Sequence, residues 1–165
     1  MNKDPVDDIL DQWSAERPEL DASSLGVVIR VMSLYRSFLG QAQRALEPLG
    51  LEPFEYDVLA ALRRQGRPFE LAATALAAET ELSSGAMTNR IDKLESRGLV
   101  KRRADKQDRR GVNVSLTAAG RRVIDDAIQH RLTAADECLA GLSARERRRL
   151  GGLLRKVVLA STANR

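Results

Sequence analysis

The sequence contains one cysteine, one histidine and few aromatic residues, and each scarcity excludes something. Cys138 has no second cysteine to pair with, so the chain forms no internal disulfide, as is usual in a reducing compartment. His130 alone cannot supply a His/Cys metal site. Because aromatic residues make up 4% of the chain, the core must consist mainly of Leu, Val, Ile and Ala. This composition favours helices over a β-sandwich or a β-barrel.

Long apolar runs and catalytic motifs are also missing. No stretch approaches the roughly 18 uninterrupted apolar residues of a membrane helix, and the acidic start MNKDPVDDIL lacks the apolar centre of a signal peptide. The sequence has no G-x-S-x-G elbow, no glycine-rich phosphate loop and no evident nucleophile–histidine pair. We therefore expect a cytoplasmic protein that is not an enzyme, with no catalytic residue, cofactor, metal or membrane partner.

The net charge of +4 is unevenly distributed along the 165 residues. Residues 1–21 hold two basic and seven acidic residues, whereas residues 90–110 hold nine basic and four acidic ones. A basic cluster in the middle of a chain suits a polyanion such as nucleic acid. A solvated charged surface explains such a cluster as well, so charge alone leaves both interpretations open.

Apolar spacing predicts two helices in the first third of the chain. A short amphipathic helix is expected over 5–14, and one long helix is expected from Leu25 to Leu49. The long helix carries a second apolar stripe, at Val27, Val31, Leu34, Phe38 and Ala45. Two stripes indicate that it packs both within its own domain and against a second chain, which predicts a dimer. A single-chain bundle with this helix at its centre is the alternative.

The middle of the chain predicts three short helices and then a hairpin. Pro53 begins a helix that closes near Gly66, and a short helix follows over Leu71–Ala78. The next helix is capped by Ser83 or Ser84 and ends before Gly98, a favourable residue after a helix. Alternating residues then predict two strands joined by a basic loop, at Leu99–Ala104 and Val112–Leu116.

Two further helices complete the chain. Thr117 is expected to cap a helix that runs to about Leu142, and Ser143 with Glu146 forms a capping box for the last one. The predicted fold is therefore mainly α with a small β wing, a winged helix-turn-helix over 53–120 with long helices on either side. A helix of this kind fits the major groove of DNA, and a basic hairpin reaches the neighbouring phosphates and minor groove.

The helix after Ser83 has one apolar and one polar face. At 100° per residue, Leu82, Met87, Ile91 and Leu94 fall on the side that faces the core. The small and polar residues that would meet DNA are Ser83, Ser84, Gly85, Ala86, Thr88, Asn89 and Lys93. Each alone fits an ordinary polar helix face, but a basic hairpin with Arg109 and Arg110 at its tip follows them. Together they favour nucleic-acid binding.

Residues 83–120 resemble the winged helix of the MarR family of bacterial transcription regulators. The most specific part is Asp108-Arg109-Arg110, followed by Val114, Leu116, Thr117 and Gly120. The resemblance extends over about 24–162 and implies a homodimer, with 24–49 and 121–162 as the dimerisation region of a single chain spanning 1–165. It also implies recognition helices that enter successive major grooves of a palindromic double-stranded DNA operator, with Arg110 in the minor groove and Asp108 bracing the wing.

A narrower resemblance concerns a ligand. The extra N-terminal helix with its Trp, the EYDVL segment at 55–59, and MTNR at 87–90 with Arg102 are similar to the urate-responsive branch of this family, the PecS type. The resemblance implies that Trp13 and Arg90 hold an anionic purine that displaces Asp57. Arg102 then passes the rearrangement to the DNA-binding lobe.

The residues themselves allow a more general reading of this site. Arg90 lies about 60° from the core face of its helix, so its charge needs a carboxylate or an anionic ligand, and Asp57 is a candidate partner. A plain Asp57–Arg90 salt bridge with Trp13 as an apolar clasp is the alternative. The function expected is a repressor released from DNA by a small anion such as urate. A response to a different aromatic or carboxylate anion or to none, or an interaction module without DNA binding, are the alternatives.

Overall fold

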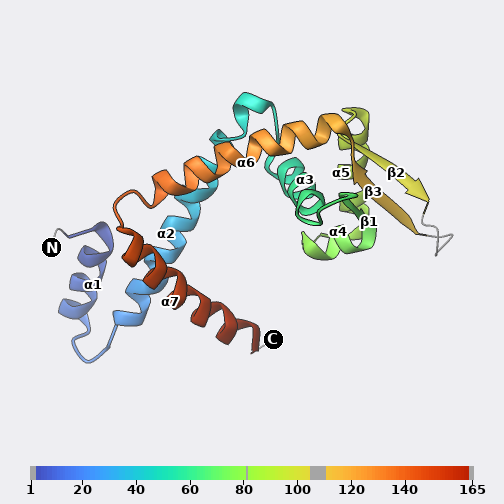
Figure 1. The fold of residues 1–165 in the computed structure, drawn as a ribbon. Helices are drawn as coiled ribbons and strands as arrows, with labels where there is room; N and C mark the ends of the chain where they lie inside the picture. The colour runs from blue at the N-terminus through green and yellow to red at the C-terminus, as the bar shows by residue number, and fades with distance from the viewer. Residues whose placement is uncertain (1–2, 81, 105–110, 164–165) are drawn as a thin grey trace. The chain divides into compact units, whose positions relative to one another are not determined.

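The structure, a computed structural model, describes residues 3–80, 82–104 and 111–163. It is mainly helical with one small antiparallel sheet, which confirms the predicted fold class (Figure 1). The elements in chain order are α1 (Pro5–Glu16), α2 (Ser23–Arg44), the 3-10 helix η1 (Glu47–Leu49), α3 (Pro53–Arg64), β1 (Glu70–Ala72), α4 (Ala73–Glu79), α5 (Ser84–Ser96), β2 (Val100–Ala104), β3 (Val112–Leu116), α6 (Ala118–Cys138) and α7 (Ala144–Ala163).

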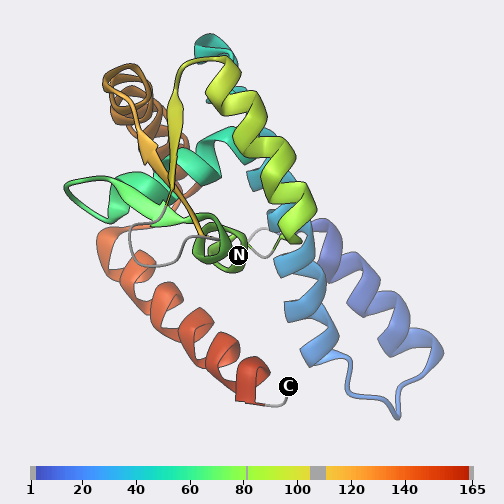
Figure 2. The ribbon, with the colours of Figure 1, turned by 90° about the vertical axis from the view of Figure 1, so that its right-hand side faces the viewer.

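The chain divides into two compact units, one ending at Gln41 and the other beginning at Ala42. In the first unit, α1 lies side by side with α2 (Figure 2). Val6 is buried, and a methyl group placed on Gly26 would lie only 2.7 Å from a methyl carbon of Leu10. Glycine at this position therefore lets the two helices approach closely.

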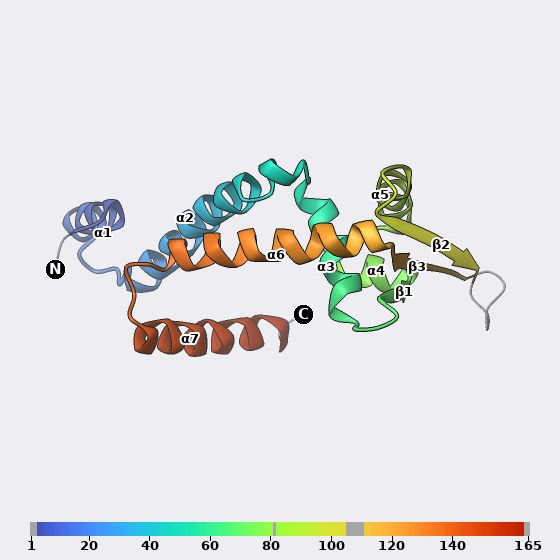
Figure 3. The same cartoon turned by 45° about the horizontal axis from the view of Figure 1, so that its top comes forward.

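The second unit has one apolar core, formed by α3, α4, α5, the sheet and the first half of α6. Its fully buried side chains include Val58, Leu59, Leu62, Leu76, Met87, Leu94, Val114 and Ile124. Of the four apolar residues predicted on the core side, Met87, Ile91 and Leu94 are buried and Leu82 is half-buried against the core, which confirms the predicted core face of α5. After α6 the chain reverses direction into α7 (Figure 3).

The sheet has three strands in the order β1-β3-β2, not the two that were predicted. Leu71 pairs with Val114, and Val100 pairs with Leu116, both in antiparallel register. The predicted helix over Leu71–Ala78 was therefore wrong at its start, because Glu70–Ala72 forms β1 and α4 begins only at Ala73. β1 exists through its pairing with a distant strand, which local periodicity does not reveal.

The long helix predicted to reach Leu49 ends earlier, at Arg44. Pro48 follows within the separate 3-10 helix η1, and Gly50 then adopts a left-handed conformation with φ of 59°. A proline inside an α-helix removes a backbone donor and clashes with the preceding turn, so the apolar spacing continues past the point where the helix does.

The predicted helix caps are present. The Ser83 hydroxyl accepts a hydrogen bond from the Ala86 amide at 3.3 Å, and the Thr117 hydroxyl accepts one from the Gly120 amide at 3.0 Å. Ser143 and Glu146 cap each other's backbone amides at the start of α7, as the capping box requires. These caps fix where α5, α6 and α7 begin. Within the described residues, no helix combines the length and the apolar character needed to cross a membrane.

Candidate nucleic-acid interface and anion site

The outer face of α5 carries small and polar side chains. Ser83, Ser84, Gly85, Thr88, Asn89 and Lys93 are exposed, and Ala86 is half-buried. The opposite face of the helix is held in the core, so this outer face is presented by a fixed scaffold. β2 and β3 extend from the same lobe away from the helices (Figure 1).

Arg102 joins β2 to α5. Its guanidinium makes 2.6 Å ion pairs with Asp92 and Glu95 and donates to the Thr88 carbonyl at 3.2 Å. Its backbone amide also donates to Glu95, at 2.9 Å. Partial burial lowers the pKa of Arg102, but the hydrogen bonds to the two carboxylates outweigh this and raise it. One side chain, that of Arg102, therefore holds the hairpin and α5 together.

The first turn of α3 contacts a row of three cations, two on α5 and one at its C-cap. The Arg90 guanidinium lies 4.7 Å from the centre of the Phe54 ring, and the Lys93 ammonium lies 4.9 Å from it. The third cation, Arg97, pairs with Glu55, whose carboxylate also accepts from the Glu52 amide at 2.9 Å. Neither Phe54 nor Glu55 was predicted from the sequence to be part of the site.

Glu55 is completely buried, and its Oε1 has no hydrogen-bond partner among the described residues. A buried carboxylate is costly unless it is paired, so the contact with Arg97 compensates for that burial. The available signal was Glu55 three residues after Glu52 with Pro53 between them, a pattern typical of a capped helix start.

Asp57 is surrounded by cations, although none forms an ion pair with it in the described parts of the chain. The surrounding protein partly desolvates its carboxyl and so raises the pKa, even though the residue as a whole is exposed. Three guanidinium groups oppose this effect, in decreasing order Arg131, Arg90 and Arg64. The direct Asp57–Arg90 pair considered from the sequence is therefore absent, because Arg90 lies over Phe54 instead.

A shallow pocket opens beside Asp57. Its volume is about 290 Å³, and Asp57, Arg64, Glu79 and Thr80 line it. Arg64 and Glu79 form an ion pair at 3.3 Å across the ends of α3 and α4. Charged groups of both signs are therefore available to an anion or a polar molecule at this position.

Arg131 of α6 was not predicted from the sequence to be part of the site. Its guanidinium lies 5.2 Å from the centre of the Tyr56 ring, and its buried Nε has no hydrogen-bond partner within the described ranges. A signal existed, since Arg131 continues the buried row of Ile124 and Ala127 at helical spacing. An arginine in an apolar row needs an anion or a carboxylate, so Arg131 extends the cationic surroundings of Asp57.

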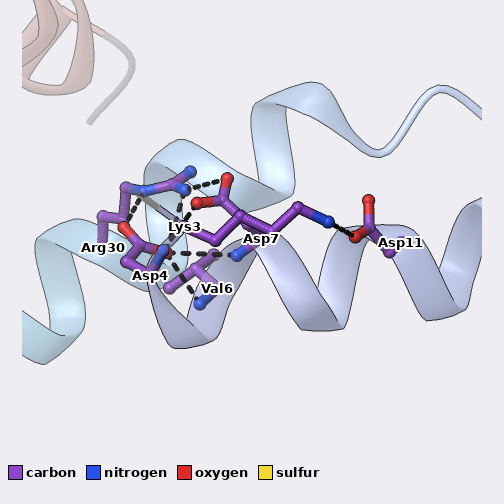
Figure 4. Close-up of polar contacts among 6 residues, drawn as sticks. All are labelled: Lys3, Asp4, Val6, Asp7, Asp11 and Arg30. Carbon is purple, nitrogen blue, oxygen red and sulfur yellow. Dashed lines mark hydrogen bonds and ion pairs between the residues drawn. The ribbon is translucent and has the colours of Figure 1, made fainter. Parts of the chain in front are cut away.

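Trp13 lies on α1 in the first unit and is exposed. The position of α1 on α2 is set by Arg30, which reaches from α2 to the first turn of α1 (Figure 4). The guanidinium donates to both carboxylate oxygens of Asp4, at 2.8 and 3.0 Å, and to Asp7 at 2.7 Å. Asp4 is also the N-cap of α1, so one arginine fixes the helix that carries Trp13.

Replacement of Arg30 by Ala is expected to release α1 from α2. Hydrogen exchange measured by mass spectrometry should show faster exchange throughout α1, with exchange in α3 and α5 unchanged. Arg36→Ala is the matched control, because Arg36 lies on the same helix and, among the described residues, bonds only within it, to the Met32 carbonyl. Equal exchange of α1 in the two variants would contradict the role of Arg30.

The same contact has a pH dependence of known sign. The hydrogen bond from Arg30 lowers the pKa of Asp4 below its ordinary value of 3.8. This stabilisation of the α1 position is present above pH 3.8 and is lost as the pH falls through the lowered value. The protection factors of the α1 amides, which correct for the slower intrinsic exchange in acid, are therefore expected to be high at neutral pH and to fall only in strong acid.

The wing residues Asp108, Arg109 and Arg110 lie outside the described residues. Within the described ranges, no group of three or more His, Cys, Asp or Glu side chains is arranged to hold a metal ion.

Comparison with known proteins gives consistent results. A MarR family profile matches residues 49–111. The HTH-type transcriptional regulator PecS of Dickeya dadantii (strain 3937) is 31% identical over 153 residues, which cover 92% of each chain. A crystal structure of an E. coli MarR mutant complexed with operator DNA superposes with a TM-score of 0.69 at 26% identity, covering 88% of this chain and 96% of that one.

A second structure is similar to the same extent. BpsR of Bordetella bronchiseptica, whose DNA binding is regulated by 6-hydroxynicotinic acid, superposes with a TM-score of 0.68 at 26% identity, covering 82% of this chain and 99% of that one. The curated relatives are transcription regulators, in agreement with the expectation that the chain is not an enzyme.

Proposed function

The chain belongs to the MarR family of transcription regulators, and we propose on that basis that it is a homodimeric repressor released from promoter DNA by a small aromatic anion. The observation that carries the proposal is the outer face of α5, small and polar on a helix whose other face is buried. The three parts of the proposal, DNA, dimer and ligand, have separate support.

For DNA, the outer face of α5 enters the major groove. The backbone approaches closely at Ser83, Ser84, Gly85 and Ala86, while Thr88 and Asn89 meet base edges and Lys93 meets a phosphate. Arg109 and Arg110 of the wing, with Asp108 as support, contact the neighbouring phosphates and minor groove by resemblance to the family. Operator binding by a relative supports this part of the proposal, since a structure of an E. coli MarR mutant holds operator DNA.

For the dimer, the support is exposed apolar surface on helices that bury little within the chain. In α7, Leu153, Leu154, Val157, Val158 and Leu159 are all exposed, and no residue of this helix is buried. In α2, Val27, Val28, Val31, Met32 and Tyr35 are exposed as well. Apolar faces of this extent mark interaction surfaces, and a second copy of the chain fits a two-fold operator.

For the ligand, the support is the cationic surroundings of Asp57. Arg90 and Arg131 each lie over an aromatic ring and have no carboxylate partner in the described part of the chain, so both are available to an anion. An anion beside Asp57 is attracted by the two arginines and repelled by the carboxylate. Its binding therefore favours a rearrangement of α5, on which Arg90 lies.

Two ligand identities have specific support. Urate follows from the four residues Trp13, Asp57, Arg90 and Arg102 that this chain shares with the urate-responsive branch, where Arg102 passes the change to the DNA-binding lobe. A hydroxylated aromatic carboxylate follows from BpsR, which responds to 6-hydroxynicotinic acid. Both are planar aromatic anions, which suits arginines that already lie against aromatic rings.

The test is binding to duplex DNA from the promoter flanking the gene, measured by fluorescence anisotropy at fixed salt of about 150 mM. We expect tight binding by the wild type that is lost on adding urate. Arg90→Ala should still bind the DNA and should not respond to urate. Arg103→Ala, which removes an exposed arginine from β2, should bind and respond like the wild type.

Each of the other possible outcomes shows which part of the proposal is wrong. If DNA binding is indifferent to urate but is lost on adding 6-hydroxynicotinate, then 6-hydroxynicotinate replaces urate as the proposed ligand. A response that survives in Arg90→Ala would place the ligand elsewhere. If no duplex binds even at about 50 mM salt, where non-specific binding is strong, the chain is an interaction module instead.

A further inference from the structure

The Phe54 ring is shared by one residue of the proposed ligand site and one of the proposed DNA face. Arg90 and Lys93 are three residues apart on α5, so their side chains lie on the same side of the helix. Both cationic groups lie within 5 Å of the centre of this one ring, at 4.7 and 4.9 Å. Phe54 itself belongs to the first turn of α3 and packs half-buried beneath them.

We propose that Phe54 is a positioning residue for DNA binding, which holds the Lys93 ammonium at the edge of the α5 outer face. The electron-rich face of the ring attracts both cations and offsets the repulsion between them. An exposed lysine otherwise samples many rotamers, and its ordering on binding a phosphate opposes the association. This inference rests on the proposed DNA-binding function.

Because Arg90 and Lys93 share the Phe54 ring, the ring also connects the proposed ligand site to the proposed DNA face. An anion that draws the Arg90 guanidinium away from the ring leaves Lys93 as the cation that remains on it. The balance of charge at the DNA face therefore changes when the ligand binds, without any contact between ligand and DNA. Arg97, the next cation along the same side of α5, pairs with Glu55, so the end of the helix stays fixed.

The ring contact is tested first, without DNA. The chain has five lysines, so labelling with [ε-¹³C]lysine gives few NMR signals, and Lys93→Arg identifies one of them. We expect the Lys93 ε-protons to be shifted upfield by the ring, the shift to vanish in Phe54→Leu, and the shift to persist in Phe54→Tyr. An unshifted Lys93 signal in a wild-type chain that binds DNA would overturn the inference and leave the proposed function intact.

The consequence for DNA is tested by a double-mutant cycle with Phe54→Leu and Lys93→Met. Phe54→Leu is expected to weaken binding about two- to fivefold, and to have little effect once Lys93 is already Met. Phe54→Tyr should restore most of the affinity.

A purely structural role for Phe54 gives a different result, because the losses would then add in the double variant. That outcome would overturn the inference. A wild-type chain that binds no duplex while its Lys93 signal is shifted would instead overturn the proposed function and leave the ring contact standing.

Discussion

Gly120→Ala is expected to lower the free energy of unfolding by about 2–3 kcal/mol, as overpacking of a tight backbone contact does. Gly120 lies in the first turn of α6, where a methyl group would come within 1.9 Å of the Leu99 carbonyl oxygen. The obstacle is backbone, which cannot rotate away as a side chain does. The gain in helix propensity from alanine, about 1 kcal/mol, opposes the loss but does not cancel it. Urea unfolding at one fixed protein concentration measures the change.

Gly85→Ala is the matched control, because this helical glycine has nothing within 4 Å of an added methyl group. Its stability should remain the same or rise slightly. If both variants unfold at the same urea concentration as the wild type, the close approach of α6 to Leu99 is wrong. The contact matters because Thr117 bonds to the carbonyls of Gly98 and Leu99 at the same point, which joins α6 to the end of α5.

Arg102→Ala is expected to weaken DNA binding by about tenfold to a hundredfold. The variant removes both ion pairs and leaves Asp92 and Glu95 as uncompensated negative charges near a phosphate backbone. It also removes the side-chain link between the hairpin and α5 and leaves, among the described residues, only the backbone amide bond to Glu95, so the two DNA-contacting elements are held less firmly in one orientation. Titration of a labelled duplex at several salt concentrations gives both the affinity and its salt dependence.

Arg103→Ala removes the same charge from the next position of β2, where the side chain is exposed and makes no ion pair among the described residues. Its loss of affinity should stay below about threefold. Equal losses in the two variants would mean that only net charge matters, and bracing by Arg102 would be contradicted. A folded chain with unchanged thermal stability is required of both variants.

The sequence predicted those features that depend on neighbouring residues. One such feature is the apolar face of α5, where Met87, Ile91 and Leu94 repeat at helical spacing. Another is the helix caps, since the hydroxyls of Ser83, Thr117 and Ser143 each accept from an amide three residues later. The strand at Glu70–Ala72 could not be found in this way, because Glu70 pairs with Ser115 of the distant strand β3. Pro48 was a local signal that α2 ends early. The prediction followed the apolar spacing instead, which continues beyond the end of the helix.

In the candidate site, too, features set by neighbouring residues were predictable and contacts with distant residues were not. The exposed face of α5 follows from helical geometry, whereas the partners of its cations lie on other elements. Asp57 was a candidate partner of Arg90, but the guanidinium lies over the ring of Phe54, one helical turn before Asp57 on α3. Arg102 was assigned by resemblance, and its contacts with Asp92, Glu95 and Thr88 show a physical connection that its position in the sequence does not.

The central place of β3 in the sheet has a consequence for how the DNA-binding lobe folds during synthesis. β1 lies before α4 and α5, yet its only strand partner among the described residues comes after them. On the ribosome, β1 must therefore wait until β3 has emerged before the sheet can close. A fragment that stops at the end of α5 would keep every residue of the outer face but lack both β2 and β3. Such a fragment is expected to remain unfolded, so the lobe cannot be shortened to its recognition helix.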